Sequence, residues 1–182
     1  NPEKFKNIRF TYVRQKSQKG LGDAVLHASH LINNEPFAIL LADDLIISEK
    51  SCLQQLADIY GMFETSVIGV NRVSADEISR YGVIHPTKDD GNILISDIVE
   101  KPRSEDAPSD LAVVGRYILD SKIFDYLKLT KEDSSNEIQL TDAIKLMLSD
   151  HKIYACEYHG NKFDCGSKSG YVEATVFMGL RD

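Results

Sequence analysis

A continuous apolar run that ends in two acids is the feature that most constrains this chain. Residues 37–42 contain no polar side chain, and Asp43 and Asp44 follow directly. Such a run is typical of a strand buried on both faces of a parallel sheet, which needs helices on both sides. Ligands of open α/β sheets bind at the carboxyl ends of strands, and Mg²⁺ prefers oxygen ligands. The run therefore predicts an α/β fold with an active-site edge at Asp43 and Asp44.

Strand-like and helix-like patterns alternate over the first 70 residues. We expect strands at residues 8–13, 37–42 and 66–70, and helices at 24–32 and 53–63. Strand patterns that alternate with helical ones predict right-handed crossovers and a doubly wound sheet.

The middle of the chain has a different pattern. Short strand patterns at residues 83–85, 93–99 and 113–119 are separated by turn-rich stretches at 86–91 and 102–108. They predict a small antiparallel β insertion beside a mixed, mostly parallel sheet. Further along we expect a helix that is capped by Asp120 and runs to residue 127. A second helix, capped by Thr141, should face the core with Ile144, Leu146, Met147 and Leu148. We also expect a last strand at 153–158 and a final helix at 169–180. No repeat or linker interrupts residues 1–182, so we predict a single domain.

Composition excludes several function classes. The net charge of −7 leaves no basic field for nucleic acid or an anionic membrane surface. Three cysteines without C-x-x-C spacing argue against a disulfide framework or a zinc ribbon and favour a reducing, cytoplasmic setting. No apolar run approaches the roughly 20 residues of a membrane span.

Two short motifs have both an ordinary and a functional interpretation. Gly20 and Gly22 fit either a tight turn into a helix or a loop that approaches a flat ligand, in which Gln15 offers an amide for a nucleobase edge. Glu100 and Lys101 fit either an exposed charged strand end or a pair that binds sugar hydroxyls and a phosphate.

The acidic residues allow a metal site. Asp43 and Asp44 could cap a turn, but a charge after an apolar strand also suits a bound cation. Asp164 lies on a second turn, and Asp43 and Asp164 could hold one Mg²⁺ if the fold brings them together. A separation above about 8 Å would remove that site. His27 and His30 fit a surface position better than a metal site, and no motif supports nucleophilic acyl transfer.

Taken in order, a set of motifs resembles the bacterial UTP–glucose-1-phosphate uridylyltransferase family over nearly the whole chain. The motifs are Arg14-Gln15, Lys19-Gly-Leu-Gly-Asp-Ala-Val25, Leu41-Ala-Asp-Asp44, Tyr81-Gly-Val83, Glu100-Lys-Pro102, Leu111-Ala-Val-Val-Gly-Arg-Tyr117, Asn136-Glu-Ile-Gln-Leu-Thr-Asp-Ala143 and Phe163-Asp-Cys-Gly166. The ordered set is far more specific than any one member.

This resemblance implies a Rossmann-like nucleotidyltransferase fold and a Mg²⁺-dependent reaction of UTP with glucose 1-phosphate that gives UDP-glucose and pyrophosphate. It also implies residue roles: Gln15 and Gly20 at the uracil, Asp43 and Asp164 on the metal, with Asp43 and Lys101 catalytic, Lys101 on the phosphate of the sugar, and Tyr81, Gly82, Glu100 and Gly115 around the glucose ring. A homo-oligomer is compatible with the resemblance.

The chain also departs from the family. Ala42 stands where the family usually has Pro, and Asp23 stands where it commonly has His. The Gly-rich triphosphate loop of the family is not found in these 182 residues, so the chain resembles the C-terminal two-thirds of the enzyme, and we expect it not to turn over UTP alone. A thymidylyl- or adenylyltransferase, a non-catalytic nucleotide-sugar binding protein and a purely structural α/β domain stay open as alternatives.

Overall fold

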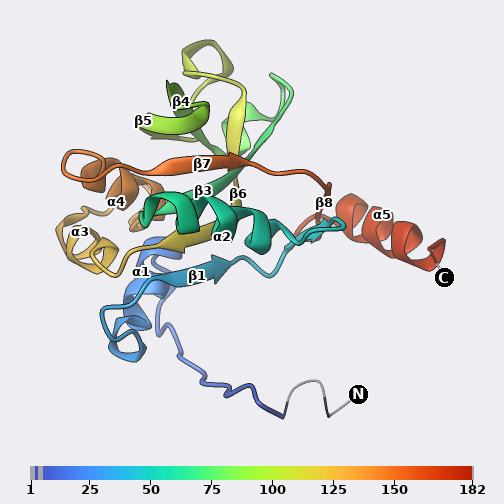
Figure 1. Ribbon diagram of the computed structural model, residues 1–182, viewed down its shortest axis with the longest axis horizontal. Coiled ribbons are helices and arrows are strands. Elements are labelled where there is room, and N and C mark those ends of the chain that lie inside the picture. The colour runs from blue at the N-terminus through green and yellow to red at the C-terminus, as the bar shows by residue number, and fades with distance from the viewer. Residues whose placement is uncertain (1–2, 4–5, 182) are drawn as a thin grey trace.

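The computed structural model describes Glu3 and residues 6–181, and these form an α/β fold (Figure 1). The helices are α1 (Gly20–His27), α2 (Cys52–Phe63), α3 (Ile123–Leu129), α4 (Leu140–Met147) and α5 (Lys168–Gly179), with 3₁₀ turns at Ser29–Leu31, Ile78–Arg80 and Ser104–Asp106. The strands are β1 (Phe37–Leu40), β2 (Asp44–Ile47), β3 (Val67–Arg72), β4 (Gly82–Asp89), β5 (Asn92–Glu100), β6 (Leu111–Leu119), β7 (Tyr154–Glu157) and β8 (Asn161–Asp164).

Six strands form one mixed sheet in the order β1-β6-β3-β7-β5-β4. The prediction of a mixed sheet flanked by helices is confirmed, but the prediction that it is mostly parallel is wrong for hydrogen-bonded neighbours. In the part of the chain that the structure describes, β3 and β7 are the one parallel pair. The reason is that β6 runs antiparallel between β1 and β3, which share a direction.

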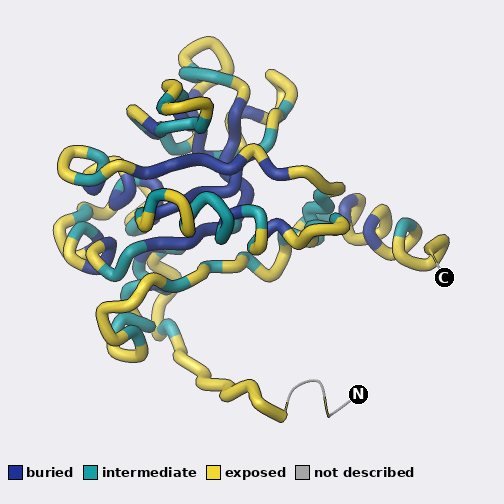
Figure 2. The backbone as a smooth tube through the Cα atoms, viewed as in Figure 1, coloured by how far each residue is buried: buried dark blue, intermediate teal, exposed yellow. Residues whose placement is uncertain are grey.

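Helices cover the two faces of the sheet, and its central strands are buried, as the dark blue parts of the tube in Figure 2 show. Successive side chains of one strand point to opposite faces of the sheet. Ile68 of β3 packs with α1, α3 and α4, whereas its neighbour Val67 packs beneath α2. Helix α2 begins where the Ser51 hydroxyl accepts a hydrogen bond from the Gln54 amide, and it ends at Glu64 in a left-handed conformation.

The predicted strand at residues 8–13 does not form. Phe10 is 65% and Tyr12 is 92% exposed, and the segment runs away from the body of the molecule (Figure 1). An alternating pattern becomes a strand only beside a partner with free backbone groups, and among the described residues no backbone hydrogen bond joins this segment to a strand.

The prediction that the apolar run is buried on both faces is also wrong. Strand β1 has alternating burial, and Leu40 is 52% exposed. The cause is that β1 is an edge strand and that α2 packs over β3, β6 and β7.

The predicted antiparallel insertion is present as the β4–β5 hairpin, which joins the main sheet instead of standing beside it. The turn at Asp90 and Gly91 has positive φ at both residues, as a two-residue hairpin favours. The sequence predicts a turn at Pro86, but strand β4 includes this residue. A register shift between His85 and Pro86 accommodates its missing N–H.

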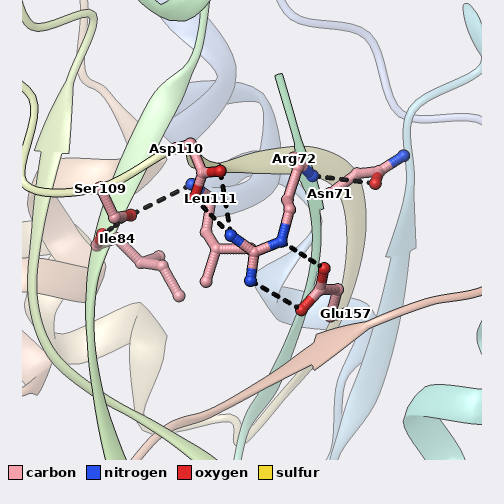
Figure 3. Close-up of polar contacts among 7 residues, drawn as sticks. All are labelled: Asn71, Arg72, Ile84, Ser109, Asp110, Leu111 and Glu157. Carbon is pink, nitrogen blue, oxygen red and sulfur yellow. Dashed lines mark hydrogen bonds and ion pairs between the residues drawn. The ribbon is translucent and has the colours of Figure 1, made fainter. Parts of the chain in front are cut away.

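An ion-pair network joins the ends of three strands in the sheet (Figure 3). The Arg72 guanidinium of β3 donates to both carboxylate oxygens of Asp110 at 2.8 and 2.9 Å and to Glu157 of β7 at 2.9 Å. These hydrogen bonds, first those to Asp110, raise the pKa of Arg72. Because all three groups are exposed to water, the network fixes geometry more than it adds stability.

The last part of the chain contains one strand that the sequence pattern missed. Strand β8 pairs antiparallel with β2, which places Asp164 opposite Asp44. Helix α4 begins at Leu140 instead of at a Thr141 cap, and Leu146 is 43% exposed instead of facing the core, whereas Ile144 and Met147 are buried.

Candidate active site

The β2–β8 pair brings Asp43 and Asp164 together although 120 residues separate them. The Cys165 amide donates to the Asp43 carbonyl at 2.7 Å. A Cβ atom added at Gly166 would lie 3.1 Å from Asp164 Oδ1 and 3.1 Å from Asp43 Oδ2, so the two oxygens are at most twice that distance apart. This is below the limit of about 8 Å set from the sequence for a shared ion.

Asp164 is held in place by two donors. The Arg80 guanidinium pairs with Oδ2 at 2.6 Å, and the Gly166 amide donates to Oδ1 at 3.1 Å. Arg80 thus pairs with one oxygen, and the other, Oδ1, is the oxygen that shares the neighbourhood of Gly166 with Asp43 Oδ2.

Asp44 has a separate partner. Its Oδ1 lies 3.0 Å from Lys162 Nζ, and both side chains are only 14% exposed. Its Oδ2 packs against Gly115, whose φ of 54° and lack of a side chain permit this contact. Arg116 holds the same turn by donating to the Leu41 carbonyl at 2.8 Å and to the Asp44 carbonyl. The two acids therefore have different surroundings, and neither Lys162 nor Arg116 was singled out from the sequence.

A cavity of about 370 Å³ opens beside these carboxylates. Seven residues singled out from the sequence line it: Asp43, Tyr81, Gly82, Glu100, Lys101, Gly115 and Asp164. Its lining also includes Asp44, which the sequence places at the active-site edge, and residues to which the sequence assigns no role in the site, namely Leu21, Leu41, Arg80, Val113, Tyr117, Gln139, Leu140 and Thr141. The fold thus collects most of the predicted site at one concave surface, and what the sequence lacked was a signal for the cations Arg80 and Lys162.

The β4–β5 hairpin builds one wall of the cavity. Gly82 and Glu100 are register partners, and a Cβ atom added at Gly82 would lie 3.2 Å from Glu100 Oε2. The Lys101 amide donates to the Tyr81 carbonyl at 3.0 Å, and Lys101 has a φ of 44°. Left-handed backbone angles are uncommon for a residue other than glycine, and such residues often mark functional sites.

Two cations lie near the Tyr81 ring. Lys162 Nζ is 4.5 Å from the ring centroid and the Arg80 guanidinium carbon is 5.7 Å from it, both within cation–π range. Nearby Tyr117 is buried, and burial together with the charges of Glu100 and Asp44 raises its pKa.

Gln15 and Gly20 do not line the cavity, but Leu21, the next residue along, does. The Gly22 amide donates to the Ile138 carbonyl at 2.8 Å, and a Cβ atom added at Gly20 would lie 2.8 Å from that same oxygen. Both positions therefore require glycine for a structural reason, because α1 packs closely on Ile138.

The described residues contain no cluster of three or more His, Cys, Asp or Glu that could hold a metal. His27 and His30 point their Nδ1 atoms at backbone carbonyls, of Asp23 at 2.8 Å and of His27 at 3.0 Å. No helix among the described residues has the length and apolar character of a membrane span.

Comparisons with known proteins agree with this geometry. The family model described as nucleotidyl transferase matches residues 2–179. A UTP–glucose-1-phosphate uridylyltransferase of Staphylococcus epidermidis is 48% identical over 172 residues, which cover 94% of this chain and 60% of the relative. The uridylyltransferase YngB of Bacillus subtilis is 45% identical, with 93% of this chain and 57% of the relative covered.

Solved structures are similar as well. A UDP-glucose pyrophosphorylase complexed with UDP-glucose superposes with a TM-score of 0.90 at 45% identity, covering 95% of this chain and 67% of that one. A UTP-bound UGPase from Acinetobacter baumannii has a TM-score of 0.85 at 35% identity, covering 97% and 62%. The chain spans about three-fifths of the length of the curated relatives that it matches. On the family match and these identities, the chain belongs to the nucleotidyl transferase family.

Proposed function

We propose that the protein containing this chain transfers the uridylyl group of UTP to glucose 1-phosphate, giving UDP-glucose and pyrophosphate. The observation that carries the proposal is the single cavity that gathers Asp43, Asp164, Glu100 and Lys101. The names of the similar proteins support the choice of UTP and glucose 1-phosphate over other pairs.

The donor set of Asp43 and Asp164 fits a magnesium ion. Two carboxylates are hard oxygen ligands, and Mg²⁺ usually takes only one or two of them and completes its shell with water and phosphate oxygens. When bound, the ion would neutralise charge on the nucleotide phosphates. Arg80 is compatible with this role because it pairs with Asp164 Oδ2 and leaves Oδ1, whose donor is the neutral Gly166 amide, for the ion.

The reaction needs charge compensation and alignment from this chain. A phosphate oxygen of glucose 1-phosphate forms the new bond to the α-phosphorus of UTP while the bond to the pyrophosphate oxygen breaks, and no proton need be removed because the phosphate is already ionised. Lys101 would hold the sugar phosphate as a point charge, and Glu100 would accept hydrogen bonds from sugar hydroxyls beside Gly82. Tyr81 and Gly115 would complete the sugar wall, and Gln15 and Gly20 would contact the uracil.

The chain's three free cysteines, of which Cys52 and Cys156 are buried and Cys165 is partly buried, support a cytoplasmic setting for this activity. A different sugar-nucleotide transferase, or a protein that binds nucleotide sugar without catalysis, would use the same cavity and would differ in the nucleotide accepted or in the absence of turnover.

The test is pyrophosphate release by the full-length protein with each nucleoside triphosphate and glucose 1-phosphate, with and without Mg²⁺. We expect Mg²⁺-dependent release with UTP, matched by UDP-glucose formation. Preference for dTTP or ATP would replace the substrate assignment, and binding of UDP-glucose without any turnover would favour the non-catalytic alternative.

A further inference from the structure

The Gln15 carboxamide lies between two hydrogen-bond acceptors. Its Nε2 donates to Asp23 Oδ2 at 2.6 Å and to the Gly20 carbonyl at 3.2 Å. A carboxylate oxygen and a peptide carbonyl only accept, so chemistry requires the NH₂ group, and not the oxygen, to face them. The carboxamide oxygen of Gln15 consequently points away from both acceptors.

Asp23 is a fixed partner for this contact. It lies in the first turn of α1 with its side chain 13% exposed, and His27 Nδ1 lies 3.5 Å from the same carboxylate oxygen. The helix itself is tied down by the hydrogen bond from Gly22 to Ile138. The orientation of the Gln15 amide is therefore set by a side chain on a rigid element.

The Gln15 amide is connected to the cavity lining through the start of α1. Gly20, which accepts from Gln15, is followed by Leu21, a residue of the cavity lining. No hydrogen bond to Gln15 Oε1 occurs among the residues that the structure describes. Gln15 Oε1 is thus an acceptor without a partner among these residues, on a side chain bonded to the residue that precedes Leu21.

We propose that Asp23 is a positioning residue that turns the Gln15 carboxamide oxygen toward the nucleobase and so selects the base. This inference rests on the proposed function, in which Gln15 contacts the base of the triphosphate. Uracil offers a ring N–H donor at N3, which a carboxamide oxygen accepts, whereas cytosine offers a lone pair at N3 and would face that oxygen repulsively. The Asp23 carboxylate, which has no donor, prevents the amide from turning over to suit cytosine.

The test compares UTP with CTP in the full-length protein and its Asp23→Asn variant. Asparagine has the same shape but carries a donor as well as an acceptor, so only the longer contact with the Gly20 carbonyl at 3.2 Å still opposes the turned Gln15 amide. We expect the ratio of kcat/KM for UTP to that for CTP to fall by about tenfold, with KM for glucose 1-phosphate unchanged. Asp125→Asn, which removes an exposed acid from the first turn of α3, is the matched control and should keep the ratio.

A double-mutant cycle separates this role from a structural one. In a Gln15→Met background, Asp23→Asn should change the ratio no further, because Asp23 acts through Gln15. Gln15→Met alone should also lower the ratio, which keeps the test open if Asp23→Asn does not fold. An unchanged ratio in Asp23→Asn or in Gln15→Met would overturn the inference and leave the uridylyl activity standing. A wild-type protein that uses no UTP would remove the proposed function, and this inference with it.

Discussion

At the scale of single residues, the site depends on how closely Gly166 lets two carboxylates approach. A Cβ atom there would lie 3.1 Å from an oxygen of each aspartate. We expect Gly166→Ala to lower the affinity for a divalent cation by about tenfold or more, because both oxygens must shift. Titration calorimetry with Mn²⁺ measures this affinity in the variant and in the wild type.

Gly61→Ala is the control for that substitution. Gly61 lies inside α2 with no atom within 4 Å of an added Cβ. It should leave cation affinity unchanged and raise the free energy of unfolding by about 0.5–1 kcal/mol, since alanine favours the helix. Equal cation affinity in both variants would show that Gly166 has no special place in the site.

At the scale of elements, the β2–β8 pair depends on the ion pair between Lys162 and Asp44. Both groups are 14% exposed, so removing one leaves a poorly solvated charge beside the cavity. We expect Lys162→Met to lower the free energy of unfolding by about 2 kcal/mol, and the double variant Lys162→Met, Asp44→Asn to recover part of the loss. Urea unfolding measures both.

Lys128→Met tests whether any lysine loss has this effect. Lys128 pairs with Asp125 on α3 at 61% exposure, so its removal should change stability by no more than about 0.5 kcal/mol. A similar loss for Lys162 and Lys128 would contradict the special role of the pair between β2 and β8.

The elements also show what sequence reasoning can reach. The sequence predicted α2 and α5 nearly to the residue, and in the structure both begin after a serine, Ser51 or Ser167, whose hydroxyl accepts a first-turn amide. Periodicity missed β8, since a four-residue strand carries too short a pattern and exists only through β2. Periodicity also predicted a strand at residues 8–13. Apolar and polar residues alternate there, but among the described residues no neighbouring strand pairs with the segment.

The site was predictable to the extent that its residues stand in ordered motifs. Asp43, Glu100, Lys101 and Asp164 could be named in advance, because strand ends and glycine turns mark them. The contacts of Arg80 with Asp164 and of Lys162 with Asp44 could not, since they join segments more than 80 residues apart in the chain. The contact of Lys162 with Asp44 depends on the register of β2 with β8.

At the scale of the whole molecule, acid should destabilise the fold through carboxylates with lowered pKa values. The hydrogen bond from Tyr154, and then that from Lys152, lowers the pKa of Asp89, and the hydrogen bond from Gln139 lowers that of Asp133. The unfolded chain then takes up protons first as pH falls. The stability that Asp89 and Asp133 contribute is fully present above pH 4, which is about the pKa of an aspartate in the unfolded chain. It is lost as the pH drops through the lower pKa values that these carboxyls have in the folded state.

Urea midpoints at pH 7, 5 and 3.5 measure this dependence. Tyr154→Phe removes the main donor to Asp89 and should flatten the part of the curve below about pH 4. Stability that stays constant down to pH 3.5 would contradict the assignment, as would an acid response in Tyr154→Phe identical to that of the wild type.

The central claim is that Asp43 and Asp164 hold one divalent cation at the sugar-nucleotide cavity. Its most direct measurement is Mn²⁺ binding to the full-length protein with UDP-glucose present, followed by electron paramagnetic resonance. We predict one bound ion in the wild type and in Asp125→Asn, and affinity at least about tenfold weaker in both Asp43→Asn and Asp164→Asn. One tightly bound ion that persists in either of those two variants would contradict the account.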